Sequence, residues 1–236
     1  MKNRREFIKA TTVAATGALL PKWSFSKPDK LRNVLILGDS ISIGYTPFVK
    51  EMMQNLAIVQ RPMLENGQPE NCEGTTKGVK NIERWIGDTN WDVIHFNFGL
   101  HDLKHVDPQT GANSRNPEDP LQADLKQYKK NLKKIVGVLL NTGADLIFAT
   151  TTPYPEKLEG PLRDPGMVEK YNRIAVKLMN RNNIMINDLY TFAQPRLNEI
   201  QLPNNVHFTD LGYRQLAEKV IDRITEMLEY PVRRNH

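Results

Sequence analysis

Short apolar runs alternate along the chain with longer segments whose apolar residues recur every three or four positions. The apolar runs predict strands at residues 33–37, 57–59, 92–98, 145–151 and 184–187. The spaced segments predict helices at residues 47–56, 78–86, 121–140, 167–180 and 209–229. A loop rich in proline, asparagine and aspartate is expected at residues 105–120. Residues 30–230 are therefore expected to form a single domain.

The regular alternation of strand and helix predicts the fold class. Strands that alternate with helices pair in parallel, and their crossover helices cover both faces of the sheet. The sequence thus predicts an α/β three-layer sandwich around a parallel sheet of about five strands. In such a fold, functional groups gather at the carboxyl ends of the strands. Residues that follow predicted strands, namely Ser40, His101, Thr151 and Asp188, are expected at one edge.

The first 26 residues differ from the rest of the chain. Arg4 and Arg5 are adjacent and precede a weakly apolar segment, residues 10–20, which is too short to span a bilayer. This order resembles a twin-arginine export signal at residues 1–26, with cleavage near Ser26. We therefore expect a periplasmic or secreted protein without a stable membrane anchor.

The charge and the cysteine content narrow the function classes. The chain carries a net charge of +5, and one acidic and five basic residues give the first 26 residues +4 of it. The remainder carries only about +1 and offers no support for nucleic acid as a partner. Cys72 is the only cysteine, so no intrachain disulfide is possible. We interpret Cys72 as structural, because no base is adjacent to it in sequence.

Two segments near opposite ends of the domain carry candidate chemistry. Ser40 follows the first predicted strand in the segment LGDSIS, a position that exposes its hydroxyl at the edge of the sheet. His207 lies in the segment NNVHFTDLGY, directly before the last predicted helix. A histidine in that loop can reach back over the sheet edge toward the serine and accept its proton.

Together the two segments resemble the SGNH (GDSL-like) hydrolase family over residues 33–228. The resemblance implies a flavodoxin-like three-layer fold and a serine esterase with Ser40 as nucleophile, His207 as base and no cofactor. It implies a small-molecule or glycan ester as substrate. The export signal and the absence of a long apolar lid favour deacetylation of a carbohydrate.

The family's two middle blocks imply an oxyanion hole. Its second block supplies a glycine N–H, for which Gly74 is our choice, with Gly67 and Gly78 as alternatives. Its third block is usually G-x-N-D, and here reads GLHD, so that His101 takes the place of the asparagine. We expect the oxyanion to be held by the N–H groups of Ser40 and Gly74 and by the imidazole of His101.

Asp39 and Asp102, which lie beside these groups in the sequence, are expected to contact the substrate. The third member of the triad is less settled. The family usually has aspartate three residues before the histidine, whereas this chain has Asn204. Asn204 can orient the imidazole without supplying a charge. A backbone carbonyl or Asp188 are the alternatives.

Two rival functions remain at this stage. His101, Asp102, His105 and Asp107 are close in sequence and could hold a metal, although a strand end followed by Pro108 argues against a shared helix face, and we expect no metal. A catalytically impaired carbohydrate-binding protein on the same fold is the other rival. The presence of both Ser40 and His207 favours an enzyme over it.

Overall fold

The computed structural model describes residues 30–230, which fold around one five-stranded sheet. The export signal predicted at residues 1–26 lies outside the described residues. The strands are β1 (Arg32–Leu37), β2 (Ala57–Gln60), β3 (Val93–Phe96), β4 (Asp145–Ala149) and β5 (Met185–Asn187). They pair in parallel in the order β2-β1-β3-β4-β5. The predicted parallel sheet of five strands is confirmed.

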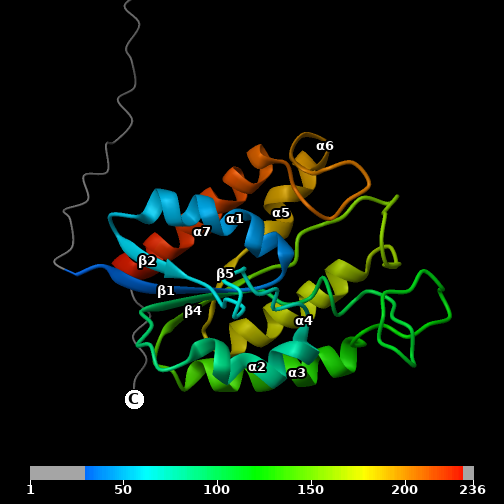
Figure 1. The fold of residues 1–236 in the computed structure, drawn as a ribbon, viewed down its shortest axis with the longest axis horizontal. Coiled ribbons are helices and arrows are strands. Elements are labelled where there is room, and N and C mark those ends of the chain that lie inside the picture. The colour runs from blue at the N-terminus through cyan, green and yellow to red at the C-terminus, as the bar shows by residue number, and fades with distance from the viewer. Residues whose placement is uncertain (1–29, 231–236) are drawn as a thin grey trace, which may run out of the picture.

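Helices cover both faces of this sheet, as predicted (Figure 1). One layer holds α1 (Ser40–Met53), α5 (Leu189–Ala193) and α7 (Asp210–Glu229). The other holds α2 (Thr75–Ile86), α3 (Leu125–Leu140) and α4 (Met167–Arg181). A short 3-10 turn, Gln194–Arg196, and α6 (Leu197–Ile200) connect α5 to α7. None of the helices within residues 30–230 is long and apolar enough to span a membrane.

The two faces of β1 show why the strands are continuous apolar runs. Leu35 and Leu37 pack into the core beneath α2, α3 and α4, whereas Val34 and Ile36 pack into the core beneath α1 and α7. All four side chains are at most 1% exposed. Successive residues of a strand point to opposite faces, so a strand between two helical layers must be apolar at every position.

Helix α1 begins at Ser40, seven residues before the predicted start. The carboxylate of Asp39 accepts a hydrogen bond from the backbone N–H of Ile41 at 3.0 Å and caps the helix. Pro47, which we took as the first residue of the helix, lies inside it. The early start places Ser40 in the first helical turn, where backbone N–H groups lack intrahelical acceptors.

Two loops meet beyond the carboxyl ends of the strands. Lys104, after β3, forms an isolated antiparallel bridge with Arg163, which precedes α4. The N–H of His105 extends this contact by donating to the carbonyl of Leu162 at 2.9 Å. The bridge brings two segments about 60 residues apart side by side at the sheet edge that carries Ser40.

Candidate active site

Ser40 and His207 meet at the edge of the sheet although 167 positions separate them. Ser40 is the first residue of α1, directly after the N-cap residue Asp39. His207 lies in the loop between α6 and α7. Ser40 Oγ and His207 Nε2 are 2.8 Å apart. That distance suits a hydrogen bond in which the hydroxyl donates to the ring nitrogen. The fold thus brings together the two residues that the sequence analysis placed at the centre of the site.

Asn205 contacts the other ring nitrogen of His207. Its Oδ1 lies 2.8 Å from His207 Nδ1 and accepts a hydrogen bond from the backbone N–H of His207 at 3.0 Å. The backbone N–H can only donate, so it requires the amide oxygen of Asn205 on this side. An oxygen there requires in turn that Nδ1 carry the ring proton. Nε2 is then left with the lone pair that faces Ser40.

The residue that contacts Nδ1 is therefore none of the three alternatives that the sequence offered. Asn204 is exposed, takes a left-handed conformation with φ 53°, and its carbonyl accepts from the N–H of Glu159 at 2.8 Å. Asp188 caps α5, and its carboxylate accepts hydrogen bonds from the N–H and hydroxyl of Thr191. Two consecutive asparagines gave no sequence signal for choosing Asn205 over Asn204.

The electrostatic surroundings keep His207 uncharged. Burial lowers the pKa of His207 below its ordinary value of 6.5, and the positive charge of Arg163 lowers it further. An amide oxygen contacts Nδ1, and within residues 30–230 no carboxylate bonds the ring to offset these two effects. The imidazole is consequently available as a proton acceptor at neutral pH.

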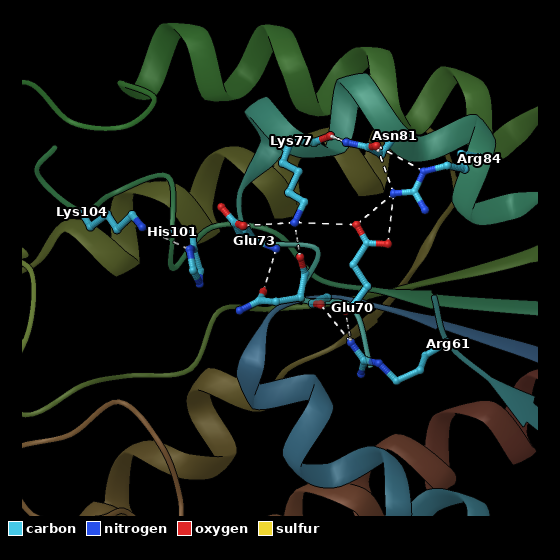
Figure 2. Close-up of polar contacts among 10 residues, drawn as sticks. Arg61, Glu70, Glu73, Lys77, Asn81, Arg84, His101 and Lys104 are labelled. Atoms are coloured by element: carbon cyan, nitrogen blue, oxygen red, sulfur yellow. Dashed lines mark hydrogen bonds and ion pairs between the residues drawn. The ribbon is translucent and has the colours of Figure 1, made fainter. Parts of the chain in front are cut away.

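His101 is held in a defined tautomer by Lys104 (Figure 2). Lys104 Nζ lies 3.4 Å from His101 Nδ1. An ammonium group only donates, so this contact uses the lone pair of Nδ1 and leaves the ring proton on Nε2. Burial lowers the pKa of His101 to about 3, with a further decrease from the charge of Lys104. A neutral imidazole with Nε2–H can serve as a hydrogen-bond donor. Lys104 was not singled out in the sequence.

Gly74 stands directly before α2 and has no room for a side chain. A Cβ atom there would come within 3.0 Å of the carboxylate of Asp102 and of Gln122 Nε2. Asp102 occupies this position because its carboxylate accepts the backbone N–H of Thr75, at 2.8 Å, and the hydroxyl of the same residue. These contacts fix the start of α2 and the backbone at Gly74.

The two aspartates expected to contact the substrate are instead buried. Asp102 is 0% exposed and bonds Thr75, so its carboxylate is a structural anchor. Asp39 is 2% exposed and caps α1 through Ile41. Both carboxylates thus hold a helix start, and their contact with a substrate stays a prediction. A polar residue at a strand end satisfies a helix N-terminus as readily as it contacts a ligand.

Arg61 connects the first turns of α1 to the loop before α2. The residue is 7% exposed, and its guanidinium donates to two hydroxyls and two carbonyls at 2.9–3.4 Å. The acceptors belong to Ser42, Thr46, Gly38 and Glu70. The carboxylate of Glu70 is held separately by Arg84, at 2.9 Å (Figure 2).

Cys72, in the same loop, is fully buried, which raises the pKa of its thiol to about 12.

The four side chains considered for a metal go to separate partners. Asp102 contacts Thr75, and the two ring nitrogens of His105 lie near the carbonyl of Asp119 and the carboxylate of Asp164. Asp107 bonds Thr110 within its own turn. Across residues 30–230, no three His, Cys, Asp or Glu side chains are grouped as metal ligands would be.

A cavity of about 480 Å³ opens over these groups. Ser40 and His207 lie in its wall beside His101. Two cations, Lys104 and Arg163, also line it. The cavity is therefore large enough for a small organic molecule, and its lining mixes these polar groups with apolar ones such as Leu100 and Val206.

The family model for the GDSL-like lipase/acylhydrolase family matches residues 36–215 of this chain. No curated protein sequence gives a significant match. Among solved structures, the acetyl xylan esterase AlAXEase is 17% identical, with a TM-score of 0.63 over 81% of this chain and 99% of that one. A lipase/acylhydrolase from Enterococcus faecalis is 18% identical, with a TM-score of 0.65 over 83% and 96%.

A catalytic mutant of Axe2, an acetylxylan esterase from Geobacillus stearothermophilus, is 16% identical, with a TM-score of 0.63 over 84% of this chain and 96% of that one. At these identities the solved structures establish the shared fold. The match to the family model covers most of the chain, from the first strand into the last helix. The chain therefore belongs to the GDSL-like lipase/acylhydrolase family and is a serine hydrolase that acts on ester bonds.

Proposed function

We propose that this protein is an exported serine esterase in which Ser40 is the nucleophile, His207 the general base and Asn205 the residue that orients the base. The observation that supports this most strongly is the continuous contact from Ser40 Oγ to His207 Nε2 and from His207 Nδ1 to Asn205 Oδ1, with both distances 2.8 Å. These contacts support the assignment, because they leave the lone pair of His207 Nε2 facing the hydroxyl of Ser40.

In the first half-reaction, Ser40 Oγ bonds to the ester carbonyl carbon while its proton passes to His207 Nε2. The carbonyl oxygen becomes an oxyanion, for which the N–H groups of Ser40 and Gly74 and Nε2–H of His101 are the proposed donors. The tetrahedral intermediate then collapses. The bond to the alcohol oxygen breaks, His207 protonates the leaving alcohol, and the acyl group stays on Ser40.

Water completes the second half-reaction. His207, neutral again, takes a proton from a water molecule whose oxygen bonds to the acyl carbon. A second oxyanion forms in the same place. When the bond to Ser40 Oγ breaks, the proton returns to the serine and the carboxylic acid leaves. The reaction consumes one water and restores the enzyme, so no cofactor is required.

An acetylated carbohydrate is the substrate that we propose. Two structural neighbours, at 17% and 16% identity, are acetylxylan esterases. Asn71, Asn113 and Asn205 line the cavity and offer amides for sugar hydroxyls. The rival function, a sugar-binding protein without turnover, is favoured only by the amide of Asn205 in the place of an acid.

The test is hydrolysis of p-nitrophenyl acetate by the wild type and by Ser40→Ala, His207→Ala and Ser114→Ala. Ser114 is the matched control, because it is a serine in the 105–120 loop whose hydroxyl bonds Asp119. We expect Ser40→Ala and His207→Ala to lose at least about 10³-fold in kcat/KM. The control should stay close to the wild type. A wild type that binds acetylated sugars but cleaves no ester would support the binding protein instead.

Export is a separate part of the proposal and rests on residues 1–26. We propose that Arg4 and Arg5 direct the folded protein to the periplasm or the medium. Cell fractionation of the full chain beside an Arg4→Lys, Arg5→Lys variant tests this. The wild type should leave the cytoplasm and lose its first residues, whereas the variant should remain inside. Equal distribution of the two proteins would rule out the signal.

A further inference from the structure

Two cations form part of the wall of the cavity that contains Ser40 and His207. Lys104 is 8% exposed, and Arg163 is partly buried. The antiparallel bridge between residues 104 and 163 holds the two backbones side by side, so the positions of the cations are set by the fold. Their pairing is therefore a built feature of the substrate cavity.

Neither cation has a carboxylate partner within ion-pair distance in the described part of the chain. Arg163 Nε donates to the carbonyl of Leu100 at 3.2 Å, and Nη1 to that of Pro161 at 3.5 Å. Lys104 Nζ contacts the neutral ring of His101.

Burial lowers the pKa of both cations, because the charged form of each side chain is poorly solvated at its position. Glu73 and Asp102 act on Lys104, and Asp39 on Arg163, only through longer-range electrostatics. A shielded positive charge without a direct carboxylate contact favours the binding of an anion.

The positive character continues away from the serine. A second cavity, of about 320 Å³, shares Gly160, Pro161 and Arg163 with the first and is also lined by Arg115 and Lys157. The acidic residues along the two cavities, Glu156 and Glu159, are both exposed to solvent. We call the two cavities together the basic groove. Residues 27–236 carry a net charge of only about +1, so the groove is a local concentration of charge.

We propose that the basic groove selects esters of carboxylate-bearing glycans, with Arg163 and Lys104 binding a substrate carboxylate while Ser40 attacks an acetyl group on the same or a neighbouring sugar. A planar guanidinium matches a carboxylate in a two-pronged hydrogen bond, and an ammonium supplies a second charge. Lys157 and Arg115 would contact a further acidic sugar of the chain. This inference rests on the proposed esterase function and adds its substrate class.

The test compares two O-acetylated oligosaccharides that differ only in the carboxylate, one of galacturonic acid and one of galactose. Acetate release by the full chain gives kcat/KM for each. We expect kcat/KM to be about tenfold or more higher for the acidic substrate. A hydrogen bond from Arg163 or Lys104 to a carboxylate is stronger than one to the hydroxyl that replaces it in galactose. High salt should reduce that preference. Arg163→Gln and, separately, Lys157→Gln should reduce it, and Arg163→Lys should restore part of the loss at position 163.

Lys133→Gln is the matched control, since it removes the same charge from an exposed position of α3 and should leave the preference unchanged. Equal kcat/KM for the two substrates would overturn the inference while leaving the esterase intact. Binding of the same oligosaccharides to Ser40→Ala, measured by calorimetry, separates the two proposals. Tighter binding of the acidic one supports the basic groove even if the wild type proves inactive, and equal binding overturns it.

Discussion

The amide oxygen of Asn205 contacts His207 twice, at the backbone N–H and at ring Nδ1. The first contact fixes which end of the amide faces the ring, and the second then fixes the ring tautomer. A neutral side chain thus performs the orienting half of the usual role of aspartate. It does not perform the other half, because it supplies no negative charge to stabilise the imidazolium that forms as Ser40 loses its proton.

Asn205→Asp should therefore change the pH dependence of the enzyme. In the wild type, burial and Arg163 lower the pKa of His207 below 6.5, so kcat/KM should reach its plateau by neutral pH and fall only in acid. A carboxylate on Nδ1 favours the protonated ring and raises its pKa. The acid limb should move upward by about one pH unit in the variant. An unmoved limb would show that residue 205 does not act on the titrating group.

Asn205→Ala removes the orienting contact without adding a charge. The ring loses the amide oxygen that contacts Nδ1 and can adopt the wrong tautomer. We expect kcat to fall by roughly 10²-fold with little change in KM, since orientation acts on the transition state rather than on binding. Asn204→Gly is the matched control and should remain near the wild type, because glycine adopts the left-handed conformation of residue 204 and the contact with Glu159 is made by the backbone.

His101 gives a second prediction, about the oxyanion donor. His101→Asn restores the family's usual residue and keeps an N–H donor, so activity toward p-nitrophenyl acetate should stay within about tenfold of the wild type. His101→Leu removes the donor and should cost roughly 10²–10³-fold in kcat. Lys104→Met removes the contact that fixes the tautomer of His101 and should lower kcat when His101 is present. In the His101→Asn background there is no imidazole tautomer to fix, so the same change should have a smaller effect. Equal effects of Lys104→Met in both backgrounds would contradict the tautomer role.

Arg61 gives a prediction about stability. Arg61→Leu would leave four buried or partly buried acceptors without their shared donor. We expect the free energy of unfolding, measured by urea titration, to fall by about 3 kcal/mol. Arg32→Leu is the comparison, because it breaks an ion pair whose side chains are 53% and 32% exposed and should cost less than about 1 kcal/mol. Similar losses for the two variants would mean that the buried network contributes little.

The sequence predicted the layers of the fold well, because the apolar pattern that marks each strand or helix lies within that segment. Each strand of the sheet lies between two helical layers, and burial on both faces requires an uninterrupted apolar run such as residues 33–37. The start of α1 was missed because Pro47 favours a first-turn position. The cap that begins the helix is instead the side chain of Asp39.

The site was less predictable where it depends on how loops meet. Two sequence motifs were enough to identify Ser40 and His207 as candidates. Which asparagine contacts His207 depends instead on a left-handed turn at residue 204, which has no sequence signal. Asp39 and Asp102 look like ligands in a sequence and are buried caps in the structure. Arg163 has no motif, and only the bridge to Lys104 places it in the cavity.

Activation of Ser40 by His207 is tested most directly with a fluorophosphonate, which reacts covalently with activated serines. The intact mass and the peptide map of the labelled protein are measured. We expect a single adduct on the peptide that contains Ser40, no adduct in Ser40→Ala, and labelling slowed at least about 10²-fold in His207→Ala. An adduct on another residue, or equal labelling of Ser40→Ala, would contradict it.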